Sequence, residues 1–298
     1  MIRNKYLEAQ INKDTIINLY HLDIYENPSY LQREFGDVKI VCMGGKASRM
    51  RELAKIWGKY CNIHNFENDL HDYSGAGDRF SMFKVYKIIF LSHGMGIPSI
   101  SIALNEVTKL LHFAGVTDPL FIRIGTCGGL GLAPGTIVVS EYCYDSQLND
   151  YQEIFVCGQS IKKKAILDKS CISEFINVSE LFVGSESKVK IVKANTMCAN
   201  DFYEEQARMD GPCNHITVDN KDAFFQKLIN EYGIRNIEME SLGFAAFCHN
   251  LGIRGMVIAL ILVDRLVSDF VSISLDEIKH HQRVVNEILM NYFKTQLE

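Results

Sequence analysis

The sequence predicts an α/β protein in which helices cover both faces of a central sheet. Two observations lead to this expectation. Short apolar segments rich in β-branched residues alternate with segments of helical periodicity, and no linker rich in proline, glycine and serine interrupts the alternation. Such an alternation is typical of sheets that are covered by helices. We therefore expect residues 1–298 to form a single domain.

The first part of the chain is expected to supply two strands, each followed by a glycine turn and a helix. Residues 38–43 are apolar and end at Gly44-Gly45. The helix that follows has an apolar stripe formed by Met50, Leu53, Ile56 and Trp57. Residues 86–94 are the next strand, and Pro98 suits the first turn of a second helix. That helix has a stripe formed by Ile100, Leu104, Val107 and Leu111.

The second part of the chain is expected to add four strands and three helices. The strands are residues 119–125, 136–144, 190–197 and 255–263, of which the last is apolar throughout. The helices are residues 222–231, residues 240–250 and a long amphipathic closing helix, and Gly252 is typical of the end of the second. One face of the closing helix carries Ile278, His281, Val285, Ile288 and Tyr292. The adjacent pair His280-His281 is expected to lie on a solvated helix face.

The composition excludes several classes of function. The chain is 47% hydrophobic and 22% charged, and its net charge of -5 argues against nucleic-acid binding. No segment approaches the roughly 18 to 20 apolar residues of a membrane span, and the N-terminus is too polar for a signal peptide. The nine cysteines have neither CxxC nor zinc spacing. We expect a cytoplasmic protein with reduced thiols and no metal site.

Three of the apolar strands are predicted to end in glycine-rich turns. The turns belong to the segments VCMGGKASR (41–49), FLSHGMGIPS (90–99) and IRIGTCGGLG (122–131). In α/β sheets, ligands bind beyond the carboxyl ends of strands, where glycines expose backbone N–H groups to anions. None of the three matches a Walker or dinucleotide-binding loop, so each by itself is an ordinary tight turn.

Two arginines lie beside these turns. Arg49 follows the first, and Arg123 precedes the third within an apolar segment. A buried charge needs an anionic partner, which is either an internal Glu or Asp or a bound phosphate. Two arginines beside separate glycine turns, with Thr126 as a hydroxyl donor, favour the phosphate.

Two further clusters have polar groups suited to an organic ligand. Gln206 and Arg208 are two residues apart and point the same way on an extended segment, where they suit the edge of an imide-like ring. The alternative is a solvated polar turn, which spacing alone favours. Glu238, Met239 and Glu240 precede an apolar helix, so they suit either a helix start or a sugar.

Taken together, these segments resemble the uridine phosphorylases, and the animal-type enzymes closely. The resemblance spans nearly the whole chain, and the motifs occur in the order of the family. The matching segments are YHL (20–22), FGDVKIVCMGGKASRM (35–50), GDRFSMFKV (77–85), SHGMGIPSISI (92–102), IRIGTCGGLGLAPGTIVV (122–139), NTMC (195–198), DFYEEQARMDG (201–211), RNIEMES (235–241) and LVDRL (262–266).

The resemblance implies a fold, a reaction and an assembly. The fold is one α/β domain with a mixed central sheet or distorted barrel between helices. The reaction is the phosphorolysis of uridine to uracil and ribose 1-phosphate, with inorganic phosphate as co-substrate and no cofactor or metal. The assembly is a homodimer in which each site takes residues from both subunits.

The resemblance also assigns roles to individual residues. Phosphate binding is assigned to Gly45, Arg49, Arg123 and Thr126, with Arg79 reaching the site of the neighbouring subunit. Uracil binding is assigned to Phe202, Gln206 and Arg208. Ribose binding is assigned to Met239 and Glu240, with His21 donated from the partner. Glu238 and Arg265 are assigned to supporting positions.

Two departures from the family pattern concern the same region. Cys127 follows Thr126, where it is either an oxidisable thiol or a passive small residue. Asp264 stands where relatives commonly carry asparagine. Purine-acting relatives use an aspartate near this point, but on a strand Asp264 faces away from the side that Arg265 occupies.

Competing interpretations remain at this stage. A purine nucleoside phosphorylase or a nucleosidase shares the fold. A nucleosidase has little use for Arg49, Arg79 and Arg123, and a purine enzyme has little use for Gln206 with Arg208. A catalytically silent nucleoside-binding homologue is the alternative from another class, because a fold does not determine a function. A nicotinamide-dependent dehydrogenase is disfavoured by the missing GxGxxG motif.

Overall fold

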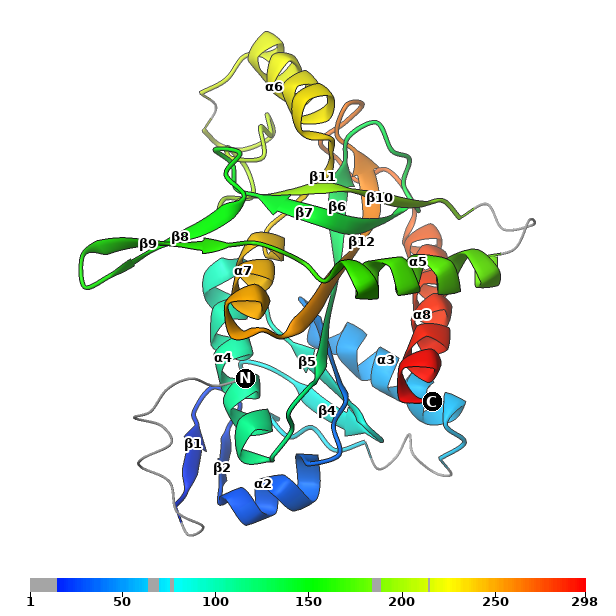
Figure 1. The fold of residues 1–298 in the computed structure, drawn as a ribbon. Coiled ribbons are helices and arrows are strands. Elements are labelled where there is room, and N and C mark those ends of the chain that lie inside the picture. Colours follow the sequence, from blue (N-terminus) through cyan, green and yellow to red (C-terminus); the bar gives the residue numbers. More distant parts are fainter. Residues whose placement is uncertain (1–14, 64–69, 76–77, 184–188, 214) are drawn as a thin grey trace.

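A computed structural model describes residues 15–63, 70–75, 78–183, 189–213 and 215–298. Its centre is an eight-stranded mixed sheet with the order β11-β10-β7-β12-β6-β3-β5-β4 (Figure 1). The strands are β3 (Ile40–Gly44), β4 (Met82–Val85), β5 (Ile88–Ser92), β6 (Leu120–Gly129), β7 (Ile137–Tyr144), β10 (Ile191–Cys198), β11 (Ile234–Glu238) and β12 (Arg254–Asp264).

One part of this sheet closes on itself. Besides its place beside β10, β11 pairs with β6, so that β6, β11, β10, β7 and β12 form a ring of five strands. The ring is mixed, since β12 runs parallel to β6 but antiparallel to β7. β3, β5 and β4 extend from β6 as an open sheet. The predicted fold class, a mixed sheet or distorted barrel flanked by helices, is confirmed.

β6 changes its neighbour halfway along its length. On one edge it pairs with β12 throughout, whereas on the other it pairs with β3 up to Ile124 and with β11 from Gly128. The glycine-rich turn predicted after residue 125 is therefore wrong, because the strand continues to Gly129. The glycines make room for arginines: a Cβ on Gly125 would lie 3.0 Å from Arg123 Nη2, and one on Gly128 would lie 2.7 Å from Arg265 Cγ.

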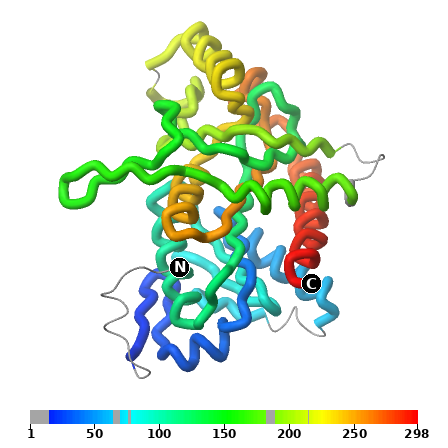
Figure 2. The backbone as a smooth tube through the Cα atoms, in the orientation of Figure 1, coloured from blue at the N-terminus to red at the C-terminus, as the bar shows by residue number. Residues whose placement is uncertain are grey.

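Helices cover the sheet on opposite sides, as expected. In Figures 1 and 2, α4 and α7 lie on one side of β6 and β12, and α3 and α8 lie on the other. The helices are α2 (Pro28–Phe35), α3 (Ala47–Tyr60), α4 (Ile97–Phe113), α5 (Lys169–Val183), α6 (Val218–Tyr232), α7 (Ser241–Leu251) and α8 (Leu275–Leu297). Within the described residues, no helix is long and apolar enough to cross a membrane.

The helix boundaries confirm the sequence signals that predicted them. Pro98 lies in the first turn of α4. The helix begins directly after Gly96, whose φ is 83°. α7 ends at Gly252, which adopts the left-handed conformation that favours glycine. The expectation of a solvated histidine pair on α8 is half wrong: His280 is exposed, but His281 packs over Gly135.

Several elements carry too little apolar periodicity for the sequence to predict them. They include α2, α5, β4, β11 and the two hairpins β1 (Ile17–Leu19)–β2 (Ile24–Glu26) and β8 (Tyr151–Val156)–β9 (Gln159–Lys164). The β8–β9 hairpin projects from the body of the molecule (Figure 2). Its turn residues Cys157 and Gly158 have φ values of 51° and 81°, as a tight hairpin turn requires, but cysteine is not a usual signal for that turn.

Candidate functional site

A cavity of about 580 Å³ lies beyond the carboxyl end of β3, where β6 exchanges β3 for β11. Every residue assigned to a site from the sequence lines this cavity, except His21 and Arg79. The assigned residues that line it are Gly45, Arg49, Arg123, Thr126, Phe202, Gln206, Arg208, Glu238, Met239, Glu240 and Arg265. They come from turns and strand ends that are far apart in the sequence. These segments meet where β6 stops pairing with β3 and begins to pair with β11.

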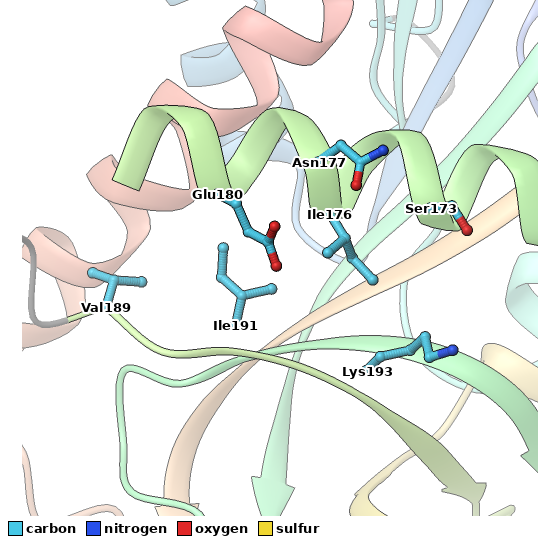
Figure 3. Close-up of a pocket in the computed structure, with 7 residues that line it drawn as sticks. All are labelled: Ser173, Ile176, Asn177, Glu180, Val189, Ile191 and Lys193. Carbon is cyan, nitrogen blue, oxygen red and sulfur yellow. The ribbon is translucent and has the colours of Figure 1, made fainter. Parts of the chain in front are cut away.

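A second cavity, of about 560 Å³, lies between α5 and β10 (Figure 3). Its lining combines apolar side chains such as Ile176 and Ile191 with Glu180 and Lys193. Lys193 Nζ is directed to Glu141 Oε1 at 3.1 Å. None of the residues assigned from the sequence lies here, so the candidate site is the first cavity.

Arg123 is one of the deeply buried charged groups of the first cavity, with 2% of its side chain exposed. Its Nη2 lies 2.8 Å from Glu238 Oε2 and also contacts Glu240 Oε2. Burial works against the charge of Arg123, but Glu238 and Glu240 outweigh it and raise the pKa of the guanidinium above its ordinary value. The internal ion pairs that the sequence left as the alternative are therefore present.

These ion pairs do not use all the donors of Arg123. Its Nε and Nη1 are buried and have no hydrogen-bond partner in the part of the chain that the structure describes. Since arginine carries five N–H donors, two donor nitrogens remain for a group bound in the cavity. Arg123 thus joins two internal carboxylates and still presents donors to a ligand.

A second cation, Arg49, lines the cavity close enough to Arg123 to feel its charge. Burial and the charge of Arg123 both lower the pKa of Arg49, and no carboxylate among the described residues forms an ion pair with it. His93 lies close to both arginines and is fully buried. Burial and the charge of Arg123 lower the pKa of His93 to about 3, so its ring is neutral at ordinary pH. A buried cation without an ion-pair partner, beside a second cation with unused donors, is typical of an anion-binding site.

The opposite part of the lining is built around Arg208. The segment 201–207 forms bends and turns rather than the extended backbone expected from the sequence, and Ala207 has a φ of 51°. Gln206 and Arg208 nevertheless both line the cavity. The Arg208 guanidinium lies 4.6 Å from the centre of the Phe202 ring, which makes a flat aromatic and cationic surface.

Met239 and Glu240 also line the cavity and lie directly before α7. The Glu238 carboxylate accepts hydrogen bonds from the N–H groups of Glu240 and Ser241, at 3.0 and 2.9 Å, and so caps the helix. Glu240 Oε1 accepts from the Gly96 N–H at 2.6 Å. Glu238 thus has the helix-start role that the sequence offered, and both glutamates line the cavity.

Comparison with known proteins identifies the family. Residues 39–290 match the model of the phosphorylase superfamily. Uridine phosphorylase 2 of Mus musculus is 38% identical over 296 residues, which cover 99% of this chain and 90% of that protein. The chain belongs to the uridine phosphorylase family.

Other members of the family have the same fold and differ in their described activity. The crystal structure of uridine phosphorylase from Schistosoma mansoni in complex with uracil has a TM-score of 0.89 and 35% identity, and covers 98% of each chain. A protein of the same organism, inactive uridine phosphorylase B, is 36% identical and covers 98% of this chain and 95% of its own length. Family membership alone therefore does not establish turnover.

His21 and Arg79, which the uridine phosphorylase resemblance assigns to the neighbouring subunit's site, lie away from the cavity of their own chain. His21 Nδ1 is 2.7 Å from Glu106 Oε1, and the backbone N–H of His21 also donates to that carboxylate. The Arg79 guanidinium lies 5.7 Å from the Tyr20 ring centre, and the rings of Tyr20 and His21 are 5.1 Å apart. The two residues thus share one surface patch.

Sequence reasoning missed several residues of the site. Lys46, Met95, Ile237 and Val271 also line the cavity, and of these Lys46 and Met95 lie in glycine-rich segments that suggested a ligand. The others are apolar residues in loops or at strand ends, where no spacing signal distinguishes a ligand wall from ordinary packing. Asp264, as expected, does not line the cavity and instead accepts from the Gly131 N–H at 2.9 Å.

Cys127 lies in the wall of the cavity but is a poor nucleophile. Burial raises the pKa of its thiol to about 12, so the thiolate is scarce at neutral pH. This favours the passive small residue over the oxidisable thiol. Within the described residues, no three His, Cys, Asp or Glu side chains gather in a way that would hold a metal ion.

Proposed function

We propose that this chain catalyses the reversible phosphorolysis of uridine to uracil and ribose 1-phosphate. One observation supports the proposal most strongly: a single cavity joins a cationic part around Arg49 and Arg123 to an aromatic and polar part around Phe202 and Gln206. Glu240 lines the same cavity and contacts Arg123. In this proposal the phosphate occupies the cationic part, the pyrimidine base occupies the aromatic and polar part, and the sugar lies beside Glu240.

The cationic part is proposed to bind phosphate. Arg49 and the free donors of Arg123 suit a dianion, and Thr126 and the backbone at Gly45 add neutral donors. Glu238 and Glu240 balance two of the local positive charges, so a cation from elsewhere strengthens binding. Arg79 of a second subunit is the proposed source.

The aromatic part is proposed to stabilise the departing base. Cleavage of the glycosidic bond leaves positive character on the sugar and negative charge on uracil. Arg208 and Gln206 supply donors where this charge develops, and each such donor typically contributes about 10²- to 10³-fold to the rate. Phosphate held by the arginines then bonds to the sugar carbon as the bond to uracil nitrogen breaks, and the arginines lower the entropic cost of that encounter.

The sugar is proposed to lie against Met239, with Glu240 accepting from its hydroxyl groups. Because Glu240 contacts Arg123 in the free protein, phosphate and sugar binding share one ion-pair network. No cofactor or metal has a part in this reaction. We further propose one domain for each subunit, a homodimer whose partner donates His21 and Arg79, and a cytoplasmic location.

The first experiment measures uracil release from uridine with and without inorganic phosphate, with inosine in parallel. Release from uridine only in the presence of phosphate is the expected result. Release without phosphate would instead indicate a nucleosidase, and turnover of inosine alone a purine nucleoside phosphorylase.

A silent nucleoside-binding protein is the second candidate, because one relative at 36% identity is described as inactive. Every side chain assigned to the reaction is present in this chain, which favours activity. Uridine binding by calorimetry without turnover under any of these conditions would establish the silent alternative.

A further inference from the structure

A carboxylate that does not line the cavity joins the segments of its base-side wall. Asp269 lies in the loop after β12, and only 8% of its side chain is exposed. Its Oδ1 accepts from Arg265 Nε at 2.9 Å, and its Oδ2 accepts from the Met209 N–H at 3.0 Å. Lys221 Nζ, on α6, donates to both oxygens at 2.9 and 3.0 Å.

The main chain of Asp269 adds a fourth contact. Its carbonyl oxygen accepts from Arg208 Nη2 at 2.8 Å, while the Asp210 carboxylate holds Nε and Nη2 of the same guanidinium. Asp269 therefore contacts the turn segment before residue 211, the end of β12 and α6. The first two of these segments supply Gln206, Arg208 and Arg265 to the cavity, and α6 lies behind them as the source of Lys221.

The contact with Arg265 determines how that side chain meets Gln206. With its Nε donating to Asp269, Arg265 directs Nη2 to the Gln206 carbonyl oxygen at 2.8 Å, and Nη1 lies 3.5 Å from Gln206 Oε1. Arg265 is buried to 1% exposure, so without Asp269 its charge would lack its ion-pair partner. The guanidinium would then turn toward another acceptor and release Gln206.

The charges around Asp269 also support a fixed arrangement. Three cations, Arg208, Arg265 and Lys221, face two carboxylates, Asp210 and Asp269. Burial opposes ionisation of Asp269, but hydrogen bonds from Lys221 and the Met209 N–H, with the charge of Arg265, lower its pKa below the ordinary value. The cluster keeps one net positive charge beside the proposed base.

We propose that Asp269 is a positioning residue for the pyrimidine base, and that Lys221 holds Asp269 in place from α6. This inference rests on the proposed function and adds two residues to it. Asp269 acts through Arg265 and Arg208, which orient Gln206 and the base-side donors. Its loss displaces these donors and leaves the cationic, phosphate-binding part of the cavity unchanged.

The test compares Asp269→Asn and Lys221→Met with the matched control Asp264→Asn. Asp264 is an aspartate at the end of β12 that does not line the cavity, and among the described residues its carboxylate accepts hydrogen bonds only from the N–H groups of Gly131 and Leu266. We expect Asp269→Asn to lower kcat/KM for uridine about 100-fold, the usual effect of a misplacement near 1 Å. The KM for phosphate should stay within about twofold, because distant sites act independently.

Lys221→Met should change the same parameters in the same direction by a smaller factor. Combined with Asp269→Asn it should add little, because both changes break one interaction. Asp264→Asn should leave the kinetics unchanged. Equal effects on uridine and phosphate, or none on uridine, would overturn the proposal. If Asp269→Asn does not fold, Lys221→Met decides by the same criteria.

Uracil binding by calorimetry separates this inference from the proposed function. If the wild-type chain binds uracil but does not turn over uridine, the proposed activity fails, while weaker uracil binding by Asp269→Asn would still support the positioning role. If Asp269→Asn binds uracil as tightly as the wild-type chain, or if neither binds it, the positioning role is wrong.

Discussion

At the scale of single residues, the buried polar groups near the cavity differ in whether they have partners. Arg123 has two carboxylates, whereas neither ring nitrogen of His93 has a hydrogen-bond partner within the described parts of the chain. Burial without a partner disfavours the charged form of a histidine. The His93 ring is therefore neutral in the folded protein, and this makes the free energy of unfolding depend on pH.

The pH dependence of stability follows from the sign of this shift. The pKa of His93 falls from 6.5 to about 3 on folding, so the unfolded chain binds the proton more tightly. The contribution of His93 to the free energy of unfolding is intact above pH 6.5 and declines as the pH falls. The loss is about 1.4 kcal/mol per pH unit, or roughly 2 kcal/mol between pH 6.5 and 5.

Urea denaturation at several pH values measures this loss. We expect His93→Leu, which does not titrate, to show a flatter decline than the wild-type chain between pH 6.5 and 5. The comparison uses the slopes, so a constant difference in stability between the two chains does not affect it. Parallel curves would mean that His93 is not the group responsible.

At the scale of elements, β6 shows why glycines in the sequence were misread. Four glycines after an apolar strand indicated a turn, but Gly125, Gly128 and Gly129 lie within the strand. They are needed because large side chains, Arg123 and Arg265 among them, occupy the space that a Cβ would fill. One strand thus supports the phosphate side through Gly125 and the base side through Gly128.

Single alanine substitutions on β6 should therefore separate the two sides. Gly125→Ala would press on Arg123, which its two ion pairs keep from moving aside, so the KM for phosphate should rise roughly 10- to 100-fold. Gly128→Ala would press on Arg265 and should mainly raise the KM for uridine. Each variant is the control for the other in steady-state kinetics. The same pattern for both would argue against separate roles.

At the scale of the whole molecule, the site assigned from the resemblance is incomplete within one chain. His21 and Arg79 share a surface patch with Tyr20 and do not line the cavity. In the twofold dimer that we propose, the same patch of each subunit would lie near the cavity of the other, so that both residues would serve the partner's site. Neither subunit alone then has a complete phosphate site.

Mixing two inactive variants tests this arrangement. Arg79→Ala and Arg123→Ala should each have greatly reduced activity. In a heterodimer of the two, one site keeps both arginines and the other has neither. A random mixture after unfolding and refolding should recover about a quarter of wild-type activity, because half of its dimers have one intact site. Activity no higher than that of the separate variants would mean that the sites are not shared.

The sequence by itself determined the fold class, most helices and strands of the central sheet, the family, and many of the residues that line the cavity. These follow from local signals: apolar periodicity, Pro98 at a helix start, Gly252 at a helix end, and motifs of family spacing. Such signals depend on neighbouring residues, so they can be read along the chain. The elements with weak periodicity, such as α5 and β11, did not produce them.

Only the tertiary structure decided which of these residues meet. The pairing of β11 with β6 closes the barrel and brings Glu238 to Arg123, 115 positions earlier in the chain. The contacts of Asp269 with Lys221 and Arg265 likewise join an otherwise unremarkable loop to α6 and β12. Ion pairs of this kind depend on distances set by strand order and helix packing, and no spacing in the sequence encodes them.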